Sequence, residues 1–253
     1  MKKTISMFMA VCALFAAPCF ASAQAKPYMS QKQVLMKAGQ KYTVKLKNAK
    51  SVKWSSSDKK VLTVSSKGVI KAKKSGKAKV TTRYKGKKYR CSVTVSAGKK
   101  KTLVVYFSAT GTTADAAKKV KKAAAADAVR IMPRKAYSQE DLDYTDDSSR
   151  TTYEQEHPSV RPAIATAVRN LKQYDTVYIG YPVWNGKEPR VIRTFLDKYK
   201  LKGKTVIPFC TSGGSGISGS MSGIREGADG ADVRSGKDLT DMSQSEVTEW
   251  IQG

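Results

Sequence analysis

Residues 102–114 read Thr-Leu-Val-Val-Tyr-Phe-Ser-Ala-Thr-Gly-Thr-Thr-Ala. The run Leu103–Phe107 is apolar and rich in β-branched and aromatic residues, which is typical of a buried central strand in a parallel sheet. Four hydroxyl side chains then surround Gly111, and a helix is expected over 113–126. Because the first turn of a helix has unpaired N–H groups and a positive dipole end, this unit predicts a phosphate site without a basic side chain.

The rest of the chain after residue 100 predicts an α/β fold. Further strands are expected over 129–132, 176–180, 205–210 and 232–235, and helices over 159–172, 189–199, 218–226 and 244–251. Strands that alternate with helices form a parallel sheet covered on both faces. Five strands suit a doubly wound sheet of order 2-1-3-4-5, with its ligand site where the first and third strands diverge.

That topology requires the loops after strands one, three and four to meet at one edge of the sheet. The first loop offers hydroxyls and helix amides, the second an exposed tryptophan, and the third a glycine-rich backbone. A phosphate site beside a flat apolar slot is what FMN needs. The predicted cofactor-binding residues are Ser108, Ala109, Thr110, Gly111, Thr112, Thr113, Pro182, Val183, Trp184, Asn185, Gly186, Thr211, Ser212, Gly213, Gly214, Ser215 and Gly216.

These motifs, together with Arg193-Thr-Phe-Leu-Asp197, resemble the flavodoxin family, specifically its branch with a Ser-Gly-Gly-Ser-Gly third loop. The similarity covers about residues 101–253. It implies that 108–113 holds the phosphate of FMN and that 182–186 and 211–216 flank the isoalloxazine ring. Electron-carrier flavodoxins are strongly acidic, whereas this region is slightly basic, so we expect a higher flavin potential and different partners.

Other chemistries on this topology are disfavoured. The first loop lacks the Cys nucleophile of a low-molecular-weight phosphatase and the Gly-Lys-Ser/Thr of a nucleoside-triphosphate site. Gly180 stands where a receiver domain needs a phosphorylatable Asp. Simpler roles stay open: the first loop could only cap its helix, Trp184 could be a core residue, and the acidic stretch 138–147 could bind a cation or form a flap over the site.

Charge divides the chain into two regions. Residues 24–99 hold 22 Lys and Arg against one acidic residue, a net charge of +21, whereas residues 100–253 hold 23 against 19, a net charge of +4. Short strands and turns over 27–96 predict an antiparallel β-sandwich. This region resembles the bacterial immunoglobulin-like domain of group 2, with Trp54 as its buried aromatic, through the motifs 52–58, 61–64, 68–72, 76–80 and 91–95.

The first residues predict a signal peptide. Lys2 and Lys3 precede an apolar stretch, and Ala21-Ser-Ala23 is a cleavage signal. We therefore expect a signal peptide over 1–23, an immunoglobulin-like domain over 24–97 and a flavodoxin-like domain over 98–253, in a secreted or cell-surface protein without a membrane span. The two remaining cysteines, Cys91 and Cys210, are expected to be buried thiols rather than a disulfide, and no metal site is expected.

The favoured interpretation is an exported FMN-binding protein that transfers electrons or reduces a small acceptor outside the cytoplasm. No side chain suggests a general acid or base, so no catalytic residue is predicted. The expected partner is a redox partner or small acceptor. The basic domain could attract an anionic cell-wall polymer or could simply expose solvated lysines without a partner, and no specific nucleic-acid recognition is expected. The alternative is a wall-associated binding or adhesion protein whose flavodoxin-like domain is a redox-inactive scaffold.

Overall fold

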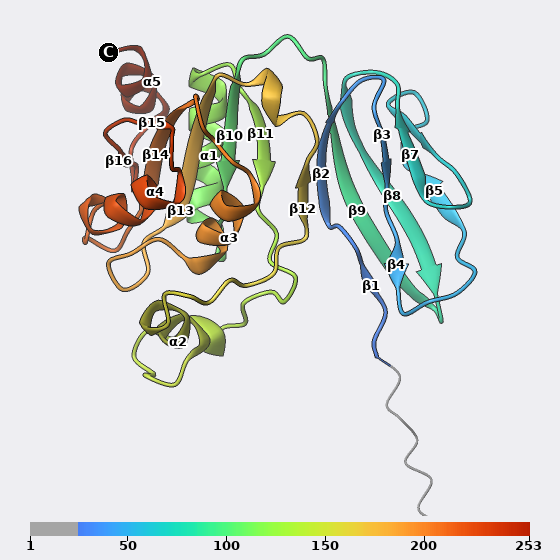
Figure 1. Cartoon of the computed structure of the whole chain (residues 1–253), viewed down its shortest axis with the longest axis horizontal. Coiled ribbons are helices and arrows are strands. Elements are labelled where there is room, and N and C mark those ends of the chain that lie inside the picture. Colours follow the sequence, from blue (N-terminus) through green and yellow to red (C-terminus); the bar gives the residue numbers. More distant parts are fainter. Residues whose placement is uncertain (1–24) are drawn as a thin grey trace, which may run out of the picture.

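The computed structural model describes residues 25–253, so the predicted signal peptide over 1–23 lies outside the described residues. These residues form an α/β part and a strand-rich part that lie side by side (Figure 1). The last strand of the first part ends at Ser96, and the first strand of the second part begins at Thr102.

The α/β part is built on a parallel sheet of order β11-β10-β13-β14-β15, with β16 also paired with β14. Leaving aside β12 (Thr166–Val168), which joins another sheet, this is the predicted order 2-1-3-4-5. The fifth strand is split into two short segments, which both pair with β14. The strands are β10 (Thr102–Tyr106), β11 (Asp127–Arg130), β13 (Thr176–Pro182), β14 (Thr205–Thr211), β15 (Asp232–Val233) and β16 (Lys237–Asp238).

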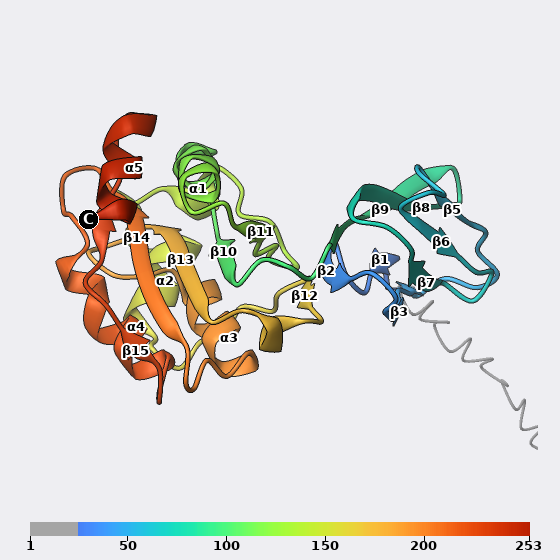
Figure 2. The same ribbon diagram turned by 90° about the horizontal axis from the view of Figure 1, so that it is seen from above.

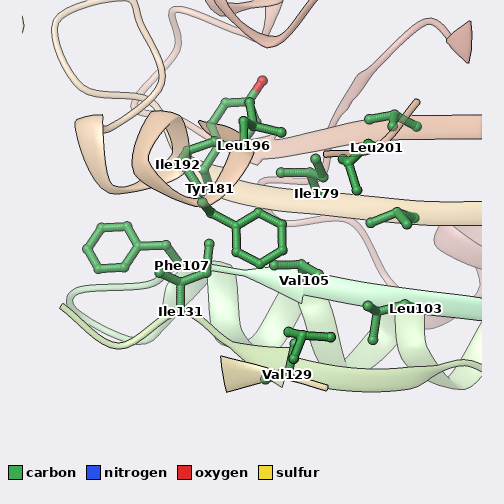
Figure 3. Packing of buried hydrophobic residues seen from close by; sticks show 14 of the residues in the cluster. Leu103, Val105, Phe107, Val129, Ile131, Ile179, Tyr181, Ile192, Leu196 and Leu201 are labelled. Atoms are coloured by element: carbon green, nitrogen blue, oxygen red, sulfur yellow. The ribbon is translucent and has the colours of Figure 1, made fainter. Parts of the chain in front are cut away.

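Helices cover both faces of this sheet (Figure 2). Successive side chains of a strand point to opposite faces, so Val104 packs in a cluster with residues of α1 and α5. Leu103 and Val105 instead pack in the cluster that holds Ile192 and Leu196 of α3 (Figure 3). The helices are α1 (Thr112–Ala123), α3 (Arg190–Lys198), α4 (Met221–Gly227) and α5 (Gln244–Gln252).

Gly180 is required by close packing between neighbouring strands. A Cβ added there would overlap the ring of Phe209, which pairs with Gly180 across the β13–β14 ladder. Phe209 is fully buried in the cluster beneath α1 and α5. The glycine therefore makes room for an aromatic side chain of the adjacent strand.

The strand-rich part is a sandwich of two sheets. Alternation along β8 and β9 buries side chains such as Val80 and Val93 and turns lysines such as Lys79 outward. Trp54 packs against the sandwich core but is only half-buried, whereas the sequence predicts a buried aromatic. One sheet holds β2 (Gln33–Lys37), β9 (Lys87–Ser96), β8 (Gly76–Tyr84) and β5 (Trp54–Ser56), the other holds β3 (Lys41–Thr43), β7 (Val69–Ala72) and β6 (Leu62–Val64), and β1 (Tyr28–Met29) pairs with β4 (Leu46–Lys47).

The predicted helix over 159–172 is wrong. The helix in this region, α2 (Arg150–Glu156), lies earlier in the chain, and Thr166–Val168 form the strand β12, which is followed by a short 3₁₀ helix over Leu171–Gln173. β12 leaves the parallel sheet and pairs in parallel with β2 of the sandwich. Threonine and valine favour strands, and here a partner strand distant in sequence overrides the local helical pattern.

The pairing of β12 with β2 joins the two parts through main-chain hydrogen bonds. Lys32 N–H donates to the Ala165 carbonyl at 2.7 Å, and Arg169 N–H donates to the Leu35 carbonyl at 2.8 Å. The joining strands also exchange core residues: Leu35 is buried in the main cluster of the α/β part, and Ala167 is buried in the cluster of the sandwich. The two parts therefore share one sheet and interlocking cores.

The two cysteines of the described residues are buried and unpaired, as the sequence predicted. Burial raises the pKa of the Cys91 thiol to about 12 and also raises the pKa of Cys210. No helix within residues 25–253 is long and apolar enough to span a membrane.

The interdomain strand can be tested with Ala167→Glu. A carboxylate forced into the sandwich core at this position should lower the free energy of unfolding by about 2–4 kcal/mol and loosen the attachment of the two parts. In calorimetry we expect a lower melting temperature and separate transitions for the two parts.

The matched control is Ala163→Glu, because Ala163 is exposed four positions earlier in the same segment. It should unfold like the unmodified protein. If Ala167→Glu also unfolded unchanged, the proposed role of β12 would be refuted.

Candidate functional site

A cavity of about 840 Å³ lies at the carboxyl edge of the parallel sheet. Its walls come from the loops that follow β10, β13 and β14, and from the segment between β11 and β12. Pockets of this size hold small ligands and cofactors. Parallel strands thus bring together three loops that are far apart in sequence.

Most of the predicted site residues line this cavity, and the others lie within the same loops. The lining members are Ala109, Thr110, Thr112, Thr113, Pro182, Val183, Trp184, Asn185, Gly186, Thr211, Ser212, Gly213 and Ser215. Ser108, Gly111, Gly214 and Gly216 do not line it; Ser108, Gly214 and Gly216 hydrogen-bond within the loops, as described next.

The first loop presents free donors to the solvent. The buried Ser108 hydroxyl accepts a hydrogen bond from Gly111 N–H at 3.1 Å, which closes the loop. Gly111 precedes α1 with a φ of 126°, a value that side chains disfavour, and it gives the helix no side-chain cap. Thr110 and Thr112 are exposed and make no side-chain hydrogen bond to any of residues 25–253. First-turn amides and two hydroxyls are therefore available to an anion.

A buried contact fixes the first loop to the third. The hydroxyls of Thr113 and Thr211 lie 2.8 Å apart, and both residues are buried. Thr113 belongs to the first turn of α1, and Thr211 ends β14. This hydrogen bond therefore holds the N-terminus of α1 at the end of β14, which β13 separates from β10.

The second loop turns tightly at Asn185-Gly186. Trp184 and Lys187 exchange two backbone hydrogen bonds of 2.9 and 3.0 Å. Asn185 and Gly186 have φ values of 47° and 73°, the left-handed conformations that a type I′ turn requires. The Asn-Gly pair thus sets the position of Trp184 at the rim of the cavity.

Trp184 is half-buried and held by its neighbours through edge contacts. Its ring centroid lies 5.4 Å from that of Phe107 and 5.0 Å from that of Tyr137, both in edge-to-face geometry. The Tyr137 hydroxyl donates to the Glu154 carboxylate at 2.7 Å, and the Arg150 guanidinium lies 3.9 Å above the Tyr137 ring. Burial, with the nearby carboxylate, raises the pKa of Tyr137, so the hydroxyl stays protonated.

The third loop is organised by Ser212. Its hydroxyl accepts hydrogen bonds from the N–H groups of Gly214 and Gly216, at 3.2 and 3.0 Å, and donates to Asp238 at 2.6 Å. Although burial alone would raise the pKa of Asp238, hydrogen bonds from Ser212 and Thr240 lower it. The Gly213 N–H has no such internal acceptor among residues 25–253, and a Cβ there would meet open space.

The segment between β11 and β12 supplies lining residues that the prediction omitted. They are Gln139, Leu142, Tyr144 and Thr151. The acidic stretch 138–147 was interpreted as a possible flap, and the structure places its residues against the cavity. Tyr144 is 79% exposed, so an aromatic ring stands at the cavity edge with most of its surface free. The sequence signal was the long polar insertion itself, which did not reveal which side chains face inward.

A sequence model described as Flavodoxin matches residues 101–253 of the chain. The chain belongs to the flavodoxin family. In this flavodoxin-family chain, residues 28–93 match a second model, described as Bacterial Ig-like domain (group 2). Both resemblances noted in the sequence are thereby confirmed. No curated protein matches the chain.

Solved structures match the flavodoxin part. A protein from Bacteroides uniformis assigned as a flavoprotein is 43% identical, with a TM-score of 0.59 over 60% of this chain and 98% of its own. One from Bacteroides eggerthii, assigned likewise, is 41% identical, with a TM-score of 0.58 over 60% of this chain and 96% of its own. A flavoprotein from Lactobacillus acidophilus, solved in complex with FMN, is 27% identical, with a TM-score of 0.47 over 60% and 99%.

The support that Asp238 gives to the third loop can be tested with Asp238→Asn. The variant should unfold more easily by about 1–2 kcal/mol at neutral pH, because two hydroxyls lose a charged acceptor. The pKa of Asp238 in the folded state is lowered below its ordinary value of 3.8. The stabilisation by this carboxylate is therefore fully present above pH 3.8 and is lost as the pH falls through the folded-state pKa.

Urea denaturation at neutral pH and at about pH 3 should therefore show the difference between the two proteins shrinking in acid. Asp232→Asn is the matched control, because Asp232 pairs with Arg234 on the exposed surface and should contribute little. A difference that did not change with pH would contradict the assigned role.

Proposed function

We propose that this chain is an exported flavoprotein that binds FMN noncovalently in the cavity at the carboxyl edge of its parallel sheet. Membership of the flavodoxin family supports the cofactor. The observation that carries the proposal is the meeting of the three loops around one cavity of suitable size. Electron transfer, or reduction of a small acceptor, is the activity that such a cofactor supports.

The first loop suits the phosphate end of FMN. A phosphate needs several donors, and the first turn of α1 with the hydroxyls of Thr110 and Thr112 supplies them. None of the residues that line the cavity is cationic. The hydroxyl contact between Thr113 and Thr211 keeps these donors in place beside the third loop.

The other end of the cavity suits a flat ring. Trp184 offers an aromatic surface, and its ring packs in edge-to-face geometry against Phe107 and Tyr137. The aromatic second loop supplies an apolar wall, and the glycine-rich third loop supplies a wall of backbone groups. Because the Gly214 N–H already donates to the Ser212 hydroxyl, the Gly213 N–H is the better candidate to contact the flavin N5 atom.

FMN, when bound, supplies one- and two-electron redox chemistry. The residues of this chain would bind and orient it: the first loop fixes the phosphate, Trp184 limits ring movement and Gly213 donates to the ring edge. Leu142 and Tyr144 of the flap would reduce water access to the cavity. No protein side chain is needed as a proton donor in this proposal.

Direct binding tests the proposal. Protein refolded with excess FMN should be yellow after removal of free ligand, and should change the fluorescence of FMN on titration. Reduction of the bound flavin by a chemical reductant, followed by reoxidation with a quinone, tests its electron transfer. A colourless protein that left FMN fluorescence unchanged would instead support the redox-inactive scaffold.

Two variants separate the two ends of the site. Trp184→Ala should weaken FMN and riboflavin alike, by about tenfold or more. The double variant Thr110→Val/Thr112→Val should weaken FMN by about tenfold but leave riboflavin, which lacks the phosphate, nearly unchanged.

Trp54→Ala is the matched control, because Trp54 lies in the sandwich. It should bind both flavins as the unmodified protein does. Equal losses for Trp54→Ala and Trp184→Ala, or equal effects of the threonine variants on both flavins, would sink the assigned orientation.

The export proposal rests on the predicted signal peptide and on the match to an Ig-like domain model. In bacteria that produce the full chain, fractionation should recover it outside the cytoplasm. N-terminal sequencing should then begin at Gln24, directly after the Ala21-Ser-Ala23 signal. Retention of the full-length chain in the cytoplasm would contradict export.

A further inference from the structure

A second cavity, of about 680 Å³, lies between the two parts of the protein. One wall is the outer face of β2, β9 and β8 of the sandwich, and the other is formed by α1, β11 and the adjoining residues. In both overall views β11 lies on the side of the α/β part nearest the sandwich (Figures 1 and 2). We call this cavity the interdomain cleft.

The pairing of β12 with β2 holds the two walls of the cleft together. Side chains add to this attachment: the Arg134 guanidinium donates to the carbonyls of Met29 and Ser30, both at 3.0 Å. Lys32 Nζ donates in return to the Arg134 carbonyl at 3.0 Å. The cleft is thus a feature of the joined molecule, which neither part has alone.

Cations line both walls of the cleft, and no carboxylate does. The sandwich contributes three of them and the α/β part three: Lys32, Lys77, Lys79, Lys118, Lys121 and Arg130. On the sandwich side this follows from its overall charge. The α/β part, however, is nearly balanced in charge, so overall charge does not explain why every charged residue that lines the cleft on that side is a cation.

Few of these charges are compensated inside the protein. Lys118 pairs with Asp115 at 2.6 Å, but both side chains are exposed, so the pair is weak. Lys77, Lys79 and Lys121 form no ion pair with any of residues 25–253. Arg130 donates one terminal N–H to the Ser108 carbonyl, while its Nε is buried without a hydrogen-bond partner among the described residues.

The cleft also carries neutral donors suited to an anion. The hydroxyls of Ser57, Ser92 and Thr94 and the amide of Gln33 line the sandwich wall. Burial, together with the nearby Arg134 guanidinium, lowers the pKa of Lys32. An anion bound beside it would relieve this electrostatic cost, because opposite charge favours the protonated amine.

We propose that the interdomain cleft binds a ligand with several closely spaced phosphate groups, held between cations of both domains. The volume suits a short oligophosphate group, which is either a free molecule or a segment of a phosphate-bearing polymer. This goes beyond general attraction of polyanions to the basic sandwich, because it requires the lysines of the α/β wall as well. It does not depend on bound FMN.

Isothermal titration of the full chain with inorganic tripolyphosphate tests the proposal. Lys77→Gln/Lys79→Gln removes charge from the sandwich wall, and Lys118→Gln/Lys121→Gln removes it from the α/β wall. Each double variant should weaken binding by about tenfold. The matched control is Lys73→Gln/Lys74→Gln, which removes two exposed lysines outside the cleft and should bind within about twofold of the unmodified protein.

Equal losses in all three variants would show that net charge alone is responsible, and would overturn the proposal, as would the absence of binding. The titration is repeated with excess FMN, because tripolyphosphate could occupy the loop at 108–113. Loss of binding under FMN would place the probe there and also overturn the proposal. Unchanged binding in the presence of FMN, where FMN itself binds, would support the proposal. Unchanged binding by the Thr110→Val/Thr112→Val variant excludes the loop at 108–113 whatever the outcome of the flavin tests.

Competition with long-chain polyphosphate distinguishes the two sources of the ligand. Displacement of tripolyphosphate by the polymer, weakened by the same cleft variants, identifies a polymer segment as the ligand. Failure of the polymer to displace tripolyphosphate identifies a free oligophosphate. Either result supports the cleft as the phosphate site.

Discussion

The candidate site depends on the parallel register of β10, β13 and β14. Tyr106 pairs with Gly180, and Gly180 pairs with Phe209, so the three strands run side by side and end at one edge of the sheet. A shift of one residue would turn every side chain to the opposite face, exchanging the clusters under α1 and α3. Burial on both faces therefore fixes the register, and the register brings the three loops around one cavity.

A second parallel pairing, between β12 and β2, determines how the sandwich is attached. An edge strand has unpaired N–H and C=O groups, and here β2 satisfies them with a strand of the α/β part. Leu35 of the sandwich is buried in the core of the α/β part, and Ala167 of the α/β part is buried in the core of the sandwich. Separation of the two parts would therefore expose apolar surface as well as backbone. This coupling makes the sandwich one wall of the interdomain cleft.

The sequence was informative where the local signal agreed with the tertiary surroundings. The strand predicted at 103–107 followed from its apolar run and is observed as Thr102–Tyr106, and the order of the sheet followed from the alternation of strands and helices and is confirmed. The strand at 166–168 was missed because its partner lies about 130 residues away, as the register with Gln33 shows. Likewise the two hydrogen bonds that Ser212 accepts from Gly214 and Gly216 depend on a loop conformation that composition does not specify.

The two proposed anion sites use different physics. The loop at 108–113 would hold a phosphate with oriented, neutral donors, whose geometry favours one phosphate position. The interdomain cleft would act through uncompensated lysines, which attract multivalent anions and lose strength as ionic strength rises. Because the cationic residues line the cleft and not the cavity, a polyanion bound there would leave the cavity free. The positive charge of the sandwich would therefore attract a polyanion to the cleft without drawing it into the cavity proposed for FMN.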